Sequence, residues 1–252
     1  MADLQHHIKC TSGDVARTVL LPGDPARAEL IAGHFDEAHQ VASNREFTTF
    51  TGRTGNVPVS VTSTGIGGPS TVIAVEELAR CGADTFIRVG TGGAQQPEIL
   101  PGSFIVATAA IRDEGTSRAY LPVEFPAAAN VEIVQALSAV GEYQGKKVLR
   151  GILHSKDSFY GQKEPERMPL AEMLVNQYES WTKGGALVSE MEAAALFITA
   201  SVLKVRAGAI ILVASNKWMK TRLNEEESRE AMSDMIDYTL AAVRQLHKQQ
   251  GR

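Results

Sequence analysis

Short runs rich in β-branched residues alternate along this chain with longer segments of helical periodicity, and this alternation limits the fold more than any other feature. The runs predicted to be strands are residues 18–21, 59–62, 85–89, 104–111, 148–154 and 209–214. Helices are expected between them, including one from 69 to the glycine at 82 and a last one over 225–248 with an apolar stripe. Such alternation predicts a layered α/β fold. Because the 252 residues contain no linker-like tract, one domain over 1–252 is the simplest prediction.

The composition excludes several classes of protein. A net charge of −4 provides no broad positive surface for nucleic acid or for an anionic membrane. The segment MADLQHHIKC lacks the apolar centre of a signal peptide, and no apolar run approaches the roughly 18 residues that span a bilayer. Cys10 and Cys81 are too few for a disulfide framework or a metal cluster. We therefore expect a cytoplasmic protein that binds neither nucleic acid nor membrane.

Three glycine-rich segments, each after a predicted strand, are candidates for an anion site, although any one of them alone would be interpreted as an ordinary turn. They are residues 21–25 (LPGDP), 64–70 (TGIGGPS) and 90–94 (GTGGA). In the middle segment, Gly67 and Gly68 let backbone N–H groups approach an anion, and Pro69 suits the start of a helix whose N-terminus favours negative charge. Since ligands collect at the carboxyl ends of strands in open α/β sheets, these turns are expected to converge.

An arginine accompanies each of several landmarks. Arg27 follows the first turn, Arg88 precedes the third by two residues, and Arg45 lies in the segment SNREF. A guanidinium matches an oxyanion with two hydrogen bonds, and an unpaired charge at Arg88, inside the apolar run FIRV, would be costly. Arg88 therefore requires an anionic partner. That partner is either a bound anion or a structural carboxylate, and the sequence leaves both open.

The segment GTG at 90–92, after a predicted strand, also imitates part of a dinucleotide-binding fingerprint. The place of the third glycine of that fingerprint is taken by Gln95, and Pro97 falls where the phosphate-binding helix should be in its first turns. A dehydrogenase is therefore not favoured.

Six motifs taken together resemble the nucleoside phosphorylase family that includes uridine phosphorylases and hexameric purine nucleoside phosphorylases. They are PGDPAR, SNREFTTF, STGIGGPSTVIAVEEL, RVGTGGAQ, EFPA and SEMEAAAL. The resemblance runs from about residue 7 to residue 216, and STGIGGPS is similar to the uridine branch. It implies an α/β/α fold with a central mixed sheet. It also implies a homo-oligomer whose active unit is a dimer with shared active sites, usually assembled as a hexamer, a trimer of dimers.

The resemblance also implies which residues contact phosphate and ribose. The implied phosphate site consists of Gly23, Arg27, Arg88 and Thr91, with Arg45 contributed by the neighbouring subunit. The implied ribose site consists of Thr91, Met191 and Glu192, with His7 contributed by the neighbouring subunit and adjacent His6 as a competitor. A carboxylate such as Glu192 accepts hydrogen bonds from two adjacent sugar hydroxyls without a metal. Without the motif, Glu190 and Glu192 would be interpreted as acidic residues at a helix start.

For the base, the segment FYGQ at 159–162 resembles the uridine branch. The implied base site consists of Phe159, Gln162 and Arg167, with Lys163 as the alternative to Arg167. The amide of Gln162 can donate and accept hydrogen bonds, and a guanidinium can stabilise charge on a departing base. Asn216 stands where purine phosphorylases of this family have an aspartic acid. An amide cannot protonate a purine, so purine activity lacks its expected acid.

The resemblance further implies a cation site. Glu46, Ile66 and Ser70 match positions that hold a monovalent cation at the dimer interface of uridine phosphorylases. A carboxylate, a carbonyl and a hydroxyl are suitable oxygen ligands for such an ion. A structural potassium or sodium ion is therefore expected, no redox cofactor is required, and inorganic phosphate is the co-substrate.

The expected activity is phosphorolysis of uridine to uracil and ribose 1-phosphate in pyrimidine salvage. The expected catalytic residues are Arg88, Glu192, Gln162 and Arg167. A purine nucleoside phosphorylase, or a nucleosidase of the same fold that uses water, is the first alternative. A nucleoside-binding or storage protein without turnover is the alternative from another class. The choice among uridine, deoxyuridine and thymidine stays open at this point.

Overall fold

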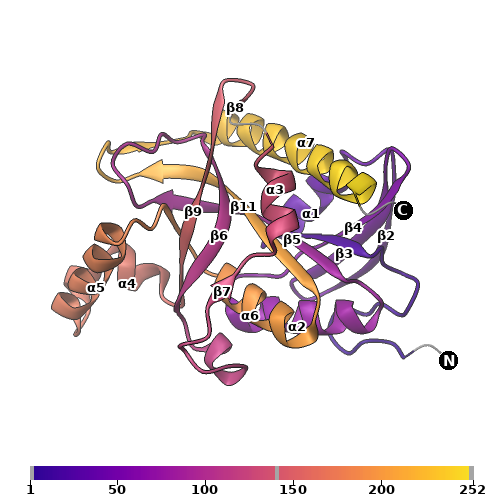
Figure 1. The fold of residues 1–252 in the computed structure, drawn as a ribbon, viewed down its shortest axis with the longest axis horizontal. Helices are drawn as coiled ribbons and strands as arrows, with labels where there is room; N and C mark the ends of the chain where they lie inside the picture. Colours follow the sequence, from indigo (N-terminus) through magenta and orange to yellow (C-terminus); the bar gives the residue numbers. More distant parts are fainter. Residues whose placement is uncertain (1–2, 140–141, 250–252) are drawn as a thin grey trace.

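The computed structural model describes residues 3–139 and 142–249 (Figure 1). The strands are β1 (Thr18–Leu21), β2 (Glu37–Asn44), β3 (Phe47–Thr54), β4 (Val57–Thr62), β5 (Thr85–Ala94), β6 (Phe104–Asp113), β7 (Ala127–Ala128), β8 (Glu142–Tyr143), β9 (Lys146–Lys156), β10 (Val188–Glu190), β11 (Arg206–Asn216) and β12 (Thr221–Arg222). The helices are α1 (Pro25–Ala32), α2 (Gly68–Arg80), α3 (Val131–Leu137), α4 (Phe159–Lys163), α5 (Ala171–Lys183), α6 (Ala193–Leu203) and α7 (Glu225–Gln249), with short 3₁₀ turns at Thr116–Ala119 and Pro165–Arg167.

The strands form a mixed sheet that is partly closed on itself. Its order runs β12-β11-β6-β9-β10-β5-β1-β4-β3-β2. Strand β5 also pairs in parallel with β11, so that β5, β11, β6, β9 and β10 form a closed ring. Beyond the ring, β1 and β4 continue the sheet in parallel with β5, and β3 and β2 add an antiparallel edge. Strand β5 therefore touches three neighbours, β1, β10 and β11, and determines how the ring joins the open sheet.

Helices cover both faces of this sheet. Figure 1 shows α2 and α6 on one side and α1, α3 and α7 on the other, and each set belongs to its own apolar core cluster. Along β11, Ile211 and Val213 point into the first cluster, whereas Ile210 and Leu212 point into the second. This alternation follows from the two-residue period of a strand. The predicted α/β/α fold with a central mixed sheet is confirmed.

Most of the elements predicted from the sequence are present. The six predicted strand segments lie within β1, β4, β5, β6, β9 and β11, and the two predicted helices correspond to α2 and α7. The sequence pattern did not reveal the β2–β3 hairpin or β10, because β2 is largely exposed and β10 has three residues. Within residues 3–139 and 142–249, no helix combines the length and the apolar character that crossing a membrane would require.

The prediction of a turn at 90–94 is wrong, because these residues are the second half of β5. Their glycines serve close packing. A Cβ atom on Gly92 would lie 2.6 Å from the backbone oxygen of Ser189 on β10, and one on Gly90 would lie 2.8 Å from Cζ of Arg88. Glycine at 92 is therefore required for β10 to approach β5, and glycine at 90 leaves room for the Arg88 side chain to lie along its own strand.

Candidate active site

The first two glycine-rich turns lie side by side. The N–H of Thr64 donates to the carbonyl of Pro22 at 2.9 Å, and the N–H of Gly65 donates to that of Gly23 at 2.8 Å. A Cβ atom on Gly23 would lie 3.0 Å from the Gly65 oxygen, so a larger residue would force the turns apart. Helices α1 and α2 begin directly after these turns. Two helix N-termini, both favourable to negative charge, therefore converge here.

Arg88 lies on β5 beside these turns and is only 5% exposed. Its Nε donates to Oε2 of Glu190 at 2.9 Å, and its Nη2 lies 2.5 Å from Oε2 of Glu192. The carboxylates of Glu190 and Glu192 thus both pair with the buried guanidinium. They use two of the five N–H donors of a guanidinium, so donors remain for an oxyanion.

The Glu190 carboxylate is fully occupied by the protein. It accepts the backbone N–H groups of Glu192 at 2.8 Å and Ala193 at 3.0 Å, and the hydroxyl of Ser155. These N–H groups belong to the start of α6, where the helix dipole favours a negative charge. Glu190 therefore fixes Arg88 against the helix and has little capacity left for a ligand.

Glu192 joins the second turn to Arg88. One of its oxygens accepts the N–H of Gly67 at 2.6 Å, and the other accepts the N–H of half-buried Met191 at 3.2 Å. Burial raises the pKa of Glu192, although the charge of Arg88 acts in the opposite direction. The carboxylate is thus held by backbone donors next to the converging turns, where a polar ligand would reach it.

Arg27 and Thr91 complete this region. Burial lowers the pKa of Arg27, and the like charge of Arg88 lowers it further, whereas Asp24 and Glu192 raise it. The pairing of β1 with β5 puts Leu21 beside Arg88, and α1, which carries Arg27, begins four residues later. Thr91 is half-buried on β5, three residues beyond Arg88. The structure therefore groups the residues that the sequence assigned to phosphate within one chain, next to the carboxylate assigned to ribose.

A cavity of about 180 Å³ lies beside this group. Its lining includes Gln162 of α4, Tyr178 of α5, and Asp113, His154 and Lys156 at the ends of β6 and β9. Nε2 of His154 lies 2.9 Å from Oδ2 of Asp113. The cavity thus combines an amide, a carboxylate and a cation, which are suitable partners for a planar polar ring.

Lys156 links the cavity to the carboxylates, and no motif in the sequence predicted it. Its Nζ donates to the hydroxyl of Ser189 at 2.6 Å, and that hydroxyl donates to Oε1 of Gln162 at 2.7 Å. Burial lowers the pKa of Lys156 to about 8, against the attraction of nearby Glu190, Glu192 and Asp113. The only signal for it in the sequence is a lysine at the carboxyl end of a strand.

Comparison with known proteins places the chain in a family. Residues 17–246 match the family described as the Phosphorylase superfamily. A uridine phosphorylase of Treponema pallidum (strain Nichols) is 46% identical over 244 residues, which cover 97% of this chain and 95% of that protein. The chain belongs to the phosphorylase superfamily. A uridine phosphorylase of Escherichia coli (strain K12) is 38% identical over 245 residues, covering 95% of this chain and 97% of that protein. A guanosine phosphorylase of Halorubrum lacusprofundi is 35% identical over 246 residues, covering 95% and 98%.

Within this superfamily member, His7 and Arg45 lie together and apart from the other site residues. Arg45 is exposed at the turn between β2 and β3 with a left-handed φ of 55°. The side-chain amide of Asn44 donates to the carbonyl of His7 at 2.7 Å. Across the described parts of the chain, no contact joins His7 or Arg45 to Arg88 or Glu192. Their contribution to a neighbouring subunit stays a prediction.

The residues expected around the base are only partly brought together. Gln162 lines the cavity, but the side chain of Arg167 is 57% exposed and pairs with Glu164 at 2.5 Å. Lys163 is exposed as well and lies over the ring of Phe159, with its Nζ 5.6 Å from the ring centre. That Arg167 contacts the base stays a prediction, and its exposed position in this structure does not support it. The ammonium group that lines the cavity is that of Lys156.

Asn216 has a structural role. Its Nδ2 donates to three backbone carbonyls within residues 96–99, at distances from 2.8 to 3.2 Å. Its Oδ1 accepts the N–H groups of Trp218 at 2.9 Å and Met219 at 3.2 Å. The side chain is therefore committed to holding two loops together, and it is neither an acid nor free to contact a base.

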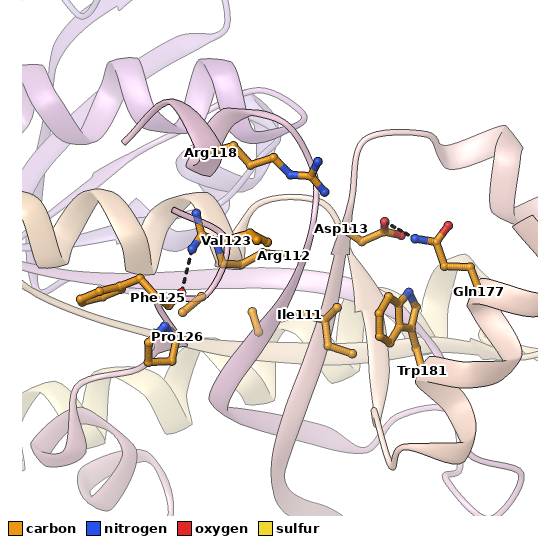
Figure 2. A pocket seen from close by; sticks show the side chains of 11 residues that line it. Ile111, Arg112, Asp113, Arg118, Val123, Phe125, Pro126, Gln177 and Trp181 are labelled. Atoms are coloured by element: carbon orange, nitrogen blue, oxygen red, sulfur yellow. Dashed lines mark hydrogen bonds between the residues drawn. The ribbon is translucent and has the colours of Figure 1, made fainter. Parts of the chain in front are cut away.

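A larger cavity of about 360 Å³ adjoins the first and shares Asp113 and Gln177 with it. Figure 2 shows Gln177 hydrogen bonded to Asp113, with Trp181 beside them and Arg118 and Phe125 across the cavity. This larger space contains none of the residues that the sequence assigned to phosphate, ribose or base. The smaller cavity beside Gln162 and Lys156 is therefore the better candidate for the base.

Replacing Arg88 with methionine should destabilise the fold, because Glu190 and Glu192 would remain buried without their cation. We expect a loss of about 3–5 kcal/mol at pH 7, measured by urea unfolding. Without Arg88 the pKa of Glu192 rises further above its unfolded value. A carboxylate with a raised folded pKa takes up a proton as the pH falls, so part of the lost stability should return as the pH is lowered from 7.

The matched control is Arg17→Met, since Arg17 forms an exposed pair with Asp84. That change should cost less than about 1 kcal/mol and show little dependence on pH. Equal losses in the two variants would contradict the assignment of Arg88 to a buried triad.

Proposed function

We propose that this chain catalyses the phosphorolysis of uridine, giving uracil and ribose 1-phosphate. The observation that supports the proposal is the contact between Arg88 and Glu192, which brings the arginine assigned to phosphate next to the carboxylate assigned to ribose. The relatives named uridine phosphorylases, matched over nearly the whole chain, support the choice of substrate. The cavity lined by Gln162 and Lys156 adjoins these carboxylates, because Lys156 donates to Ser189, the residue before Glu190. Phosphate, ribose and base are thereby assigned to adjacent places.

Phosphate occupies the converging turns in this proposal. The free N–H donors of Arg88 and the guanidinium of Arg27 bind its oxygens, and the hydroxyl of Thr91 and the N–H groups around Gly23 complete the site. This arrangement holds one phosphate oxygen below C1′ of the sugar, which saves the entropy of bringing two reactants together. The nucleophile is inorganic phosphate, and no redox cofactor takes part.

The ribose lies against Glu192 and Met191. The carboxylate accepts hydrogen bonds from the 2′- and 3′-hydroxyls while positive charge develops on the sugar. The bond between C1′ and N1 breaks, and its electron pair passes to the uracil ring and its O2 atom. Lys156 is placed to stabilise that charge, and Gln162 recognises the polar edge of the base. The proton that finally neutralises uracil balances the one that phosphate loses on becoming an ester.

The active unit is proposed to be a homodimer with shared sites, assembled further as a trimer of dimers. Arg45 and His7 are held together at the surface, and the apolar side chain of Ile66 nearby in the second turn is 78% exposed. Burying this exposed apolar side chain in an interface would favour association with another subunit.

The same region fits a monovalent cation. The hydroxyl of Ser70 lies 3.2 Å from the Ile66 carbonyl, and these two oxygens, with the carboxylate of Glu46, are proposed as its ligands at the interface. The proposed location is the cytoplasm.

The substrate is tested with a panel of nucleosides, each assayed with and without phosphate. Uridine should be cleaved only when phosphate is present, and at least about tenfold more efficiently than guanosine or inosine. Cleavage without phosphate would make the protein a nucleosidase, and binding without any turnover would make it a nucleoside-binding protein. Equal efficiency on guanosine would contradict the assignment to pyrimidines. The same panel ranks deoxyuridine and thymidine.

Replacing Lys156 with methionine should lower the single-turnover rate on uridine by about 10²-fold, the usual effect of losing one donor to a developing anion. The loss should be several-fold smaller on 5-fluorouridine, because fluorine already stabilises the departing base. The exposed Lys183 offers a matched control, and Lys183→Met should leave both rates unchanged. If the loss of rate is smaller on 5-fluorouridine for Arg167→Met but not for Lys156→Met, Arg167 is the residue that stabilises the departing base.

The shared site is tested by mixing two inactive variants. Arg45→Ala and Arg27→Ala are used, because replacing Arg88 also perturbs the fold. If Arg45 acts across the interface, a mixed dimer has both lesions in one site and an intact second site. Refolding equal amounts together makes about half of the dimers mixed, so about a quarter of wild-type activity should return. A mixture that stays inactive after subunit exchange has been verified would place Arg45 in its own chain's site.

A further inference from the structure

One buried carboxylate on α2 holds the N-terminal segment in place. Glu77 accepts the backbone N–H groups of His7 and Ile8, both at 2.9 Å. Its Oε1 also lies 2.6 Å from Nδ1 of the His7 ring. Burial raises the pKa of Glu77, but the hydrogen bonds from Ile8 and His7 lower it by more, so the pKa is lowered overall. The carboxylate is therefore ionised at neutral pH and orients both the backbone and the ring of His7.

This contact decides which proton the ring carries. An ionised carboxylate can only accept hydrogen bonds, so Nδ1 of His7 must be the protonated nitrogen. In a neutral imidazole, Nε2 then keeps its lone pair and can only accept. The ring is further confined by Phe47, whose centroid lies 6.4 Å away, and by the bond from Asn44 to the His7 carbonyl. The histidine side chain is 31% exposed, so the ring is accessible to a ligand outside its own chain.

We propose that Glu77 is a positioning residue for the reaction: by holding the proton on Nδ1 of His7, it leaves Nε2 to accept a hydrogen bond from the nucleoside's 5′-hydroxyl at the ribose site to which the family resemblance assigns this histidine, in the partner subunit. The inference rests on the proposed function and deepens it. Glu77 touches no substrate, and its effect passes entirely through His7. It follows that Glu77 matters only for nucleosides that carry a free 5′-hydroxyl.

The test compares uridine with 5′-deoxyuridine, which lacks the hydroxyl that His7 accepts. The wild type should prefer uridine by about tenfold in kcat/KM, the usual worth of one such hydrogen bond. In Glu77→Ala this preference should fall to near one, while kcat/KM for 5′-deoxyuridine stays within about twofold of the wild type. His7→Ala should show the same pattern, and the double variant should be no worse than either single one, because both changes remove one interaction.

Glu76 provides the matched control, since it is a neighbouring carboxylate on α2 that pairs with Arg80 instead. Glu76→Gln should keep the full preference for uridine. An equal loss on both nucleosides in Glu77→Ala would make Glu77 merely structural and overturn the proposal, as would additive effects in the double variant. If Glu77→Ala does not fold, the nearly isosteric Glu77→Gln is tested by the same ratio of kcat/KM for uridine and 5′-deoxyuridine. The single amide oxygen of glutamine cannot accept hydrogen bonds from both backbone N–H groups and from Nδ1 of the ring. A wild type that does not cleave uridine with phosphate would instead refute the proposed function.

Discussion

The buried triad of Arg88, Glu190 and Glu192 is the interaction on which the rest of the site depends. Removing three charges from water is costly, and the cost is offset only if the charges are paired with one another and hydrogen bonded. Here the start of α6 supplies backbone N–H groups to Glu190, and the turn before α2 supplies one to Glu192. The triad therefore joins β5, β10, α6 and the second glycine-rich turn. A change in any of these elements would disturb the charge balance of the others.

The closed ring of strands explains why the triad can exist at all. Strand β5 pairs with β11 along its length and with β10 at its end, and the antiparallel β10 brings Glu190 alongside β5. Glycine at 92 lets the backbone of β10 approach β5 closely, and glycine at 90 leaves room for the Arg88 side chain along the strand. The same closure brings the end of β9, with Lys156, next to β10. Charged groups that are far apart in sequence thus meet in one water-poor space, where electrostatic interactions are strong.

The candidate site residues fall into two groups, one buried within the chain and one at its surface. The arginines of β5 and α1 stay with the carboxylate of Glu192, whereas Arg45 and His7 lie at the surface and are joined through Asn44. Helix α2 connects the two parts, because the turn at its N-terminus donates to Glu192 and its Glu77 holds His7. In the proposed dimer, one helix would therefore contribute to the geometry of two sites.

The sequence by itself determined the layered α/β class, six of the strands, and the glycine and arginine positions that group around the site. These features depend on local periodicity, on turn chemistry and on motifs that are contiguous in the chain. Only the tertiary structure decided that 90–94 is a strand, that Arg88 is neutralised by two carboxylates, and that Asn216 ties loops together. It alone placed Lys156 in the cavity and Arg167 at the surface. The reason is physical, since a charge is set by partners that the fold brings within hydrogen-bonding distance, and here those partners lie about one hundred residues away in sequence.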